Sequence, residues 1–182
     1  MQQTIIYKTT YLQDKYEIFR EDLKIGKLYK SNWLGSTIET TVNSQNYKFT
    51  SKGIINHIIS IVDKNSNEYI GEVKFSTFLR LHPTAILTMK SNKMYKWSAK
   101  GWISSNWQWI DMNSSQVLVN ANDQLSVFKN FGSISSSSQN KDEELLIGLG
   151  IHLRNIVPRA NMISILLGII ILSIYLPKLF SH

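Results

Sequence analysis

Two short stretches of the chain alternate between two kinds of residue with a period of two. In residues 47–53 (YKFTSKG) the aromatic rings fall on one face and the lysines on the other, and residues 95–101 (YKWSAKG) repeat this order. Alternation of this kind is typical of a β-strand that is buried on one side. We therefore predict antiparallel strands whose aromatic side chains point inward and whose lysines point outward.

The two stretches belong to a longer internal repeat. Residues 38–70 align without gaps on residues 86–118, an offset of 48, and ten of the 33 positions are identical. Each copy continues into a second apolar run and closes on a turn that begins at Asp63 or Asp111. Since a repeat of this length usually corresponds to one supersecondary unit, each copy is predicted to be a β-hairpin unit.

Further strands are expected on both sides of the repeat. Residues 16–33 resemble the repeat in their Ile-Gly-charged-apolar ending, and residues 68–75 alternate in the same way. Two more short strands are expected at residues 117–119 and 124–128. Many short strands at spacings of about 8 to 12 residues indicate an all-β barrel or sandwich. Closure into a barrel hides the edge strands, so a closed antiparallel barrel is favoured.

After residue 130 the pattern changes twice. Residues 132–140 are rich in serine and are interpreted as a flexible polar spacer. Residues 142–157 begin with acidic side chains and continue as an apolar run that Pro158 ends, which predicts a helix apolar on nearly every side. At about 22 Å it suits the inside of a small barrel. Its two glycines, Gly148 and Gly150, are interpreted as an aid to close packing rather than as part of a dinucleotide-binding loop.

A second hydrophobic segment, residues 160–176, follows the first. Its 17 residues would form about 25 Å of helix, which is at the lower limit for crossing a membrane. We therefore divide the chain into a β-barrel with a central helix (1–157) and a C-terminal hydrophobic helix (158–182) that is a candidate tail anchor. The proposed anchor residues are Met162, Ile165, Leu166, Ile169, Leu172 and Leu176.

The composition gives the chain a net positive charge and excludes several kinds of site. The chain has 20 basic and 13 acidic residues, a net charge of +7, and 16 of the basic residues are lysines. Lysine acts as a point charge and not as a bidentate fork, so diffuse attraction to an anionic surface is expected. The absence of cysteine excludes disulfides, thiolate metal sites, cysteine nucleophiles and S-acylation. No signal peptide is evident at the amino terminus.

No motif predicts catalysis. The four histidines are isolated from one another and from acidic partners, and no G-x-S-x-G motif occurs, so no catalytic residue, metal site or cofactor is expected. Tryptophans near the second pair of lysines suggest an aromatic and basic platform for single-stranded nucleic acid. Because Trp107 and Trp109 occupy positions that are isoleucine in the other copy, we favour a role in the core and expect no nucleic-acid partner.

The order of these elements resembles that of the tubby C-terminal-like superfamily, which includes tubby proteins, LURP-one-related proteins and phospholipid scramblases. The resemblance covers residues 16–157 and is carried by YEIFREDLKIGKLY, by the two repeat units and by DEELLIGLGIHLRNI. It implies a closed barrel of about a dozen strands around one hydrophobic helix. The cysteine-rich stretch and Pro-rich amino terminus of scramblases are missing from this chain, and the phosphoinositide-binding Lys/Arg pair of tubby proteins does not align to particular positions.

The expected function is that of a non-enzymatic, membrane-associated barrel in the cytoplasm that contacts anionic lipids or a membrane-bound partner. The residues proposed to face an anionic leaflet are Lys48, Lys52, Lys96 and Lys100. Two alternatives remain open: a scramblase-like lipid transporter, and a soluble binding module whose last helix packs on the barrel or on a partner. The identity of any protein partner is not indicated.

Overall fold

The fold was analysed in a computed structural model, which describes residues 2–9, 15–30, 37–52, 58–77, 82–100, 106–125, 130–137 and 142–157. These residues form twelve β-strands and a helix of residues 143–157. The strands are β1 (Gln2–Thr9), β2 (Lys15–Arg20), β3 (Leu23–Lys30), β4 (Thr37–Val42), β5 (Gln45–Lys52), β6 (Ile58–Asp63), β7 (Tyr69–Thr77), β8 (Thr84–Met89), β9 (Met94–Lys100), β10 (Asn106–Asp111), β11 (Val117–Leu125) and β12 (Asn130–Ser137).

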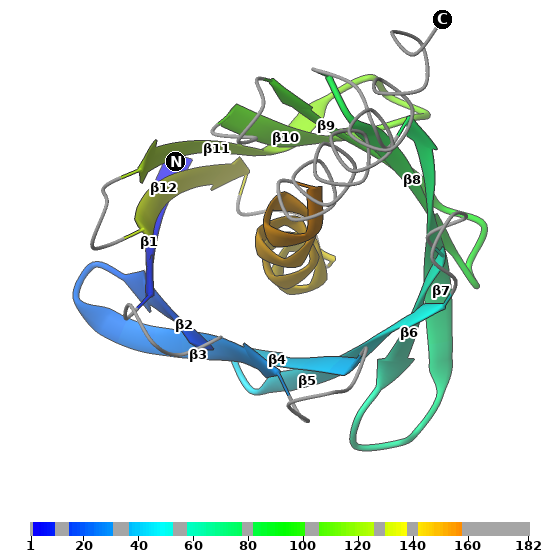
Figure 1. Cartoon of the computed structure of the whole chain (residues 1–182), viewed down its shortest axis with the longest axis horizontal. Helices are drawn as coiled ribbons and strands as arrows, with labels where there is room; N and C mark the ends of the chain where they lie inside the picture. Colours follow the sequence, from blue (N-terminus) through cyan, green and yellow to red (C-terminus); the bar gives the residue numbers. More distant parts are fainter. Residues whose placement is uncertain are drawn as a thin grey trace, which may run out of the picture.

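The strands form one closed antiparallel barrel. Each strand pairs with its neighbours in sequence, and β1 pairs with β12 to complete the ring (Figure 1). Every strand therefore has a hydrogen-bonded partner on both sides, which removes the sheet edges that could recruit other chains. The prediction of a closed all-β barrel is confirmed.

The internal repeat corresponds to equivalent turns between β6 and β7 and between β10 and β11. In the first turn, the N–H groups of Asn65 and Ser66 donate to Asp63 Oδ1 at 2.7 and 2.9 Å. In the second, the equivalent amides donate to Asp111 Oδ1 at 2.8 and 3.0 Å. These backbone hydrogen bonds, from Ser66 above all in the first turn and from Ser114 in the second, lower the pKa of each carboxyl. The two copies of the repeat thus form turns that are stabilised by the same hydrogen bonds.

Two details of the strand prediction are wrong. Residues 132–137, interpreted as a flexible spacer, lie in β12, where Ile134 and Ser136 point inward and Ser133 and Ser135 point outward. The serines have low β-propensity, but pairing with both β1 and β11 outweighs it. Residues 117–125 form the single strand β11 rather than separate strands.

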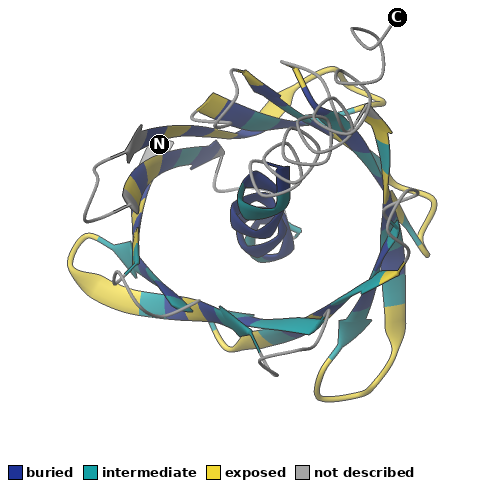
Figure 2. Cartoon of the chain, viewed as in Figure 1, coloured by how far each residue is buried: buried dark blue, intermediate teal, exposed yellow. Residues whose placement is uncertain are grey.

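The helix lies inside the barrel, as its apolar sequence predicted (Figure 2). Its residues 145–154 are all buried, and the strands turn large side chains toward the interior, among them Phe49, Trp97 and Trp109, each with 0% exposure. Its two glycines provide space for this packing. A methyl group added at Gly148 would lie 2.9 Å from Thr40 Oγ1, and one added at Gly150 would clash with the ring of Trp107.

Polar contacts at its two ends fix the direction of the helix. At its start, Asp142 accepts hydrogen bonds from Lys93 at 2.8 Å and from Tyr95 at 2.6 Å, beside the β8–β9 turn. Near its end, Tyr16 at the beginning of β2 donates to Asn155 at 2.8 Å. The helix therefore begins at the end of the barrel that carries the β8–β9 turn, where each even-numbered strand is followed by an odd-numbered one. We call this the entry end. The helix finishes where odd-numbered strands end, which we call the exit end.

A buried ion pair joins the helix to the barrel wall. Arg154 Nε donates to Asp123 Oδ2 at 2.6 Å, and the Tyr7 hydroxyl donates to the other oxygen of the same carboxylate. Burial raises the pKa of Asp123, against the opposing effect of the Arg154 guanidinium. The loss of hydration therefore outweighs the attraction, so the pair is expected to set the position of the helix rather than to add much stability.

Removing one partner of this pair should be far more harmful than removing both. Asp123→Ala leaves a buried, unpaired guanidinium and should lower the free energy of unfolding by about 3–5 kcal/mol. Asp123→Leu combined with Arg154→Met leaves only the Tyr7 hydroxyl without its acceptor and should cost about 1 kcal/mol. Urea denaturation measures both. As a control, Lys90→Ala breaks an ion pair in which both side chains are more than 60% exposed, and should change stability by about 1 kcal/mol or less. Equal losses in the single and double variants would contradict this account.

The contact between Gly150 and Trp107 gives a second test. Gly150→Ala inserts a methyl group against the indole ring and should lower the free energy of unfolding by about 1–3 kcal/mol, although alanine favours helix. Combining it with Trp107→Leu should give a smaller loss than the sum of the two single changes, because the ring that opposes the methyl group is gone. Strictly additive losses in the free energy of unfolding, measured by thermal or urea denaturation, would show that residues 150 and 107 are not in steric conflict.

Candidate functional site

The four lysines proposed from the sequence lie on the outer surface of the barrel. Lys48 and Lys52 are exposed on β5, and Lys96 and Lys100 are exposed on β9. Strands β6, β7 and β8 separate the two pairs. At about 4.8 Å per strand, the pairs are about 19 Å apart along the curved wall, so they do not form one compact patch.

Strand register places two of these lysines in a row that the sequence did not reveal. The residues directly opposite one another on successive strands from β5 to β10 are Lys52, Ile58, Lys74, Ile86, Lys96 and Ile110. Lysine and half-buried isoleucine alternate along this row, with about 10 Å between successive lysines. Lys74 was missed because it lies outside the repeated lysine pattern, and only the pairing of β7 with β6 and β8 shows its position.

The lysines differ in how far acidic neighbours neutralise them. Lys74 lies 2.5 Å from Glu72. Lys48 lies directly across from Glu39, whose carboxylate is already paired with Lys64 and accepts a hydrogen bond from Tyr29 at 2.6 Å. The hydrogen bond from Lys64, followed by that from Tyr29, lowers the pKa of Glu39. This anion stays charged near Lys48 and partly offsets its positive charge.

Three of the proposed lysines have no such neighbour. Lys52, Lys96 and Lys100 form no ion pair with any acidic residue that the structure describes. Their neighbours across the strands are isoleucine or asparagine. These three cations are therefore available to an anion from outside the protein.

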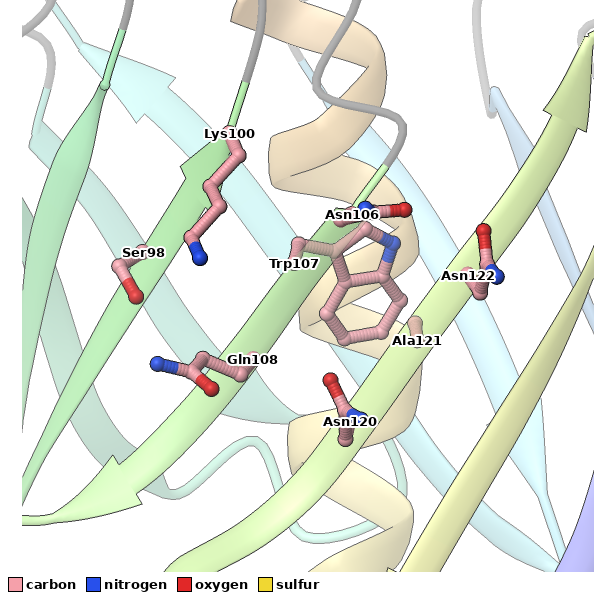
Figure 3. A pocket seen from close by; sticks show the side chains of 8 residues that line it. All are labelled: Ser98, Lys100, Asn106, Trp107, Gln108, Asn120, Ala121 and Asn122. Carbon is pink, nitrogen blue, oxygen red and sulfur yellow. The ribbon is translucent and has the colours of Figure 1, made fainter.

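A shallow groove of about 220 Å³ lies beside Lys100 on the outer face of β9, β10 and β11 (Figure 3). Side chains that carry amide and hydroxyl groups line it together with the lysine, and no acidic side chain does. The lining residues are Ser98, Lys100, Asn106, Trp107, Gln108, Asn120, Ala121 and Asn122. Amide N–H groups and a lysine can both bind the oxygens of a phosphate or carboxylate, so the groove can hold an anionic head group.

The aromatic platform considered for nucleic acid is not present among the described residues. Trp97, Trp107 and Trp109 are at most 1% exposed and face the interior, which confirms the core interpretation for these three. Trp102 lies outside the described residues. The lysines of β9 point away from the rings, so aromatic faces and charges do not combine on one surface.

The remaining candidate chemistry concerns metal ligands and the histidines. Within the described ranges no group of three His, Cys, Asp or Glu side chains is arranged to hold a metal ion. His152 is buried in the helix and stacks on Phe49 with 5.7 Å between ring centroids. His82 is exposed, and His57 and His182 lie outside the described residues.

The hydrophobic C-terminal segment of residues 160–176, with the proposed anchor residues Met162, Ile165, Leu166, Ile169, Leu172 and Leu176, lies outside the described residues. In the part of the chain that is described, no helix has both the length and the apolar character needed to cross a bilayer.

Comparison of the chain with protein-family models, with curated proteins and with solved structures found no match.

Proposed function

We propose that this protein is a non-enzymatic, membrane-associated barrel that contacts anionic lipid head groups through outward-facing lysines. The observation that carries the proposal is the set of exposed lysines, Lys52, Lys96 and Lys100, without acidic partners among the described residues. The amide-lined groove beside Lys100 supports it, since it offers hydrogen bonds to head-group oxygens.

The expected strength of this contact is moderate. A lysine near an anionic leaflet contributes about 1 kcal/mol, and salt screens the attraction over about 8–10 Å. A few lysines therefore cannot hold the protein on a membrane permanently. A second, apolar contribution is needed, and residues 160–176 are proposed to supply it as a tail anchor. The anionic cytoplasmic leaflet is the proposed location of the barrel.

The order of elements also supports the proposed relationship to the tubby C-terminal-like superfamily. That resemblance implies a closed barrel of about a dozen strands around one hydrophobic helix, and a barrel of this kind is described here. We propose membership on this basis. A scramblase-like lipid transporter remains the alternative within the same superfamily, and lipid flip in reconstituted vesicles that contain the full chain would favour it.

The lipid contact is testable with vesicles. The full chain should bind vesicles of phosphatidylcholine and phosphatidylserine more tightly than vesicles of phosphatidylcholine alone, and added salt should reduce the difference. Changing Lys48, Lys52, Lys96 and Lys100 together to glutamine should weaken binding to the anionic vesicles at least about tenfold. Co-sedimentation measures the binding. Equal binding to both kinds of vesicle would refute the electrostatic contact.

The tail is tested separately in the full chain. Changing Leu166 and Ile169 to lysine places two charges in the middle of the apolar segment, and each should oppose insertion by about 2.5–3.5 kcal/mol. Membrane flotation at high salt should then be lost, whereas the conservative changes of the same residues to valine should retain it. If the lysine variant still floats at high salt, residues 160–176 are not the anchor, and the soluble-module alternative gains support.

A further inference from the structure

Lysines gather at the exit end of the barrel, where the helix finishes. Strands β3, β5 and β9 each end at a lysine, β1 has a lysine at its second-last position, and β2 begins with one. We call these residues the lysine rim: Lys8, Lys15, Lys30, Lys52 and Lys100. Four of them come from the arc of strands β1 to β5 and the fifth from β9, and the antiparallel order brings them to one end.

Two rim lysines have no carboxylate within 4 Å among the described residues: Lys52 and Lys100. Lys8 lies over the ring of Phe19 at 5.2 Å and directly across from Glu17 on β2, and Lys15 is 3.7 Å from the same Glu17. Asp123, third from the end of β11, faces inward and is bound by Arg154.

The entry end has the opposite character. Its five described cations each lie within 4 Å of a carboxylate: Arg20 of Glu143, Lys24 of Glu17, Lys64 of Glu39, Lys90 of Glu68 and Lys93 of Asp142. Three successive acids, residues 142–144, begin the helix there. Among the described residues, lysines without an ion pair therefore occur at the exit end and on the side wall, as at Lys96, but not at the entry end.

From this charge asymmetry we propose that the barrel docks end-on, with the lysine rim against an anionic bilayer and the entry end turned away from it. The inference rests on the proposed lipid contact and adds its orientation. A side-on arrangement would use the row from Lys52 to Ile110, but that row follows the curved wall over six of the twelve strands, and a flat bilayer reaches only part of it. The rim lysines, by contrast, all lie at the same end of the barrel, so a bilayer that approaches this end approaches all of them.

Charge-matched variants of the full chain separate these arrangements. The rim variant is Lys52→Gln with Lys100→Gln, and the side variant is Lys48→Gln with Lys96→Gln, which changes the equivalent lysines of the same two strands. The entry-end control is Lys90→Gln with Lys93→Gln. Each removes two charges from exposed side chains and should leave the melting temperature nearly unchanged.

Binding to vesicles of phosphatidylcholine and phosphatidylserine should fall about tenfold or more for the rim variant, and no more than about twofold for the other two. An equal or larger loss in the side variant would overturn end-on docking and leave the proposed lipid contact standing. Unchanged binding in all three would also overturn it. If the unmodified chain does not prefer anionic vesicles, the proposed function itself fails.

A second measurement reports orientation without altering charge. The chain has no cysteine, so one cysteine can be placed and labelled with an environment-sensitive dye. Asn106→Cys puts the dye at the exit end, beside Lys100, and Ser91→Cys puts it in the β8–β9 turn at the entry end; both positions are exposed. With the same vesicles, only the dye at residue 106 should shift to the blue and be quenched by lipid-borne quenchers. Equal responses at the two positions, or a response at residue 91 alone, would overturn the proposal.

Discussion

The enclosure of an apolar helix by a ring of twelve strands is the constraint on which the rest of this structure depends. A ring of this size surrounds more space than its own inward side chains fill, and the helix fills it. A helix can do so because its backbone groups are hydrogen-bonded within the segment, so few polar groups are carried into the apolar interior. The strands in turn have no free edge once β1 meets β12. The helix thus fills the space that the barrel encloses, and the barrel buries the apolar surface of the helix.

Inward-facing and outward-facing residues of the barrel wall are under different constraints. Inward positions must match the helix closely: the two glycines face Thr40 and Trp107, and Arg154 is held by Asp123. Outward positions have no such requirement, and the two copies of the repeat differ there. The first copy presents Ser60 and Glu72 in the places where the second has Gln108 and Asn120. The amide-lined groove beside Lys100 is therefore built partly from side chains that the first copy lacks, so the duplicated hairpin unit has kept its turns and diverged in its surface.

The sequence contained local information but not register. The alternation at Tyr47 and Tyr95 and the apolar run after Asp142 predicted inward rings and a central helix, because each is visible within one stretch of chain. The closed barrel was predicted from the number and spacing of the strands. The serines of β12 looked like a spacer because their strand is stabilised by two distant neighbours and not by its own composition. Lys74 and the rim were missed for the same reason: only strand pairing determines which lysines share a row or an end. The buried pair of Asp123 and Arg154, 31 residues apart, carried no motif that could have shown it.

The position of the helix at the end of the described chain has a consequence for how the protein is made. The contacts that complete the fold are among the most distant in sequence: Tyr7 meets Asp123 across 116 residues, and Tyr16 meets Asn155 across 139. Folding slows as the average sequence separation of contacts rises, because loop closure must precede the stabilising pairings. During synthesis, eleven strands emerge from the ribosome before the strand that seals the ring, and the helix comes last. Until then the aromatic lining lacks the helix that covers it, and exposed apolar surface of this kind makes an incompletely folded chain prone to aggregation.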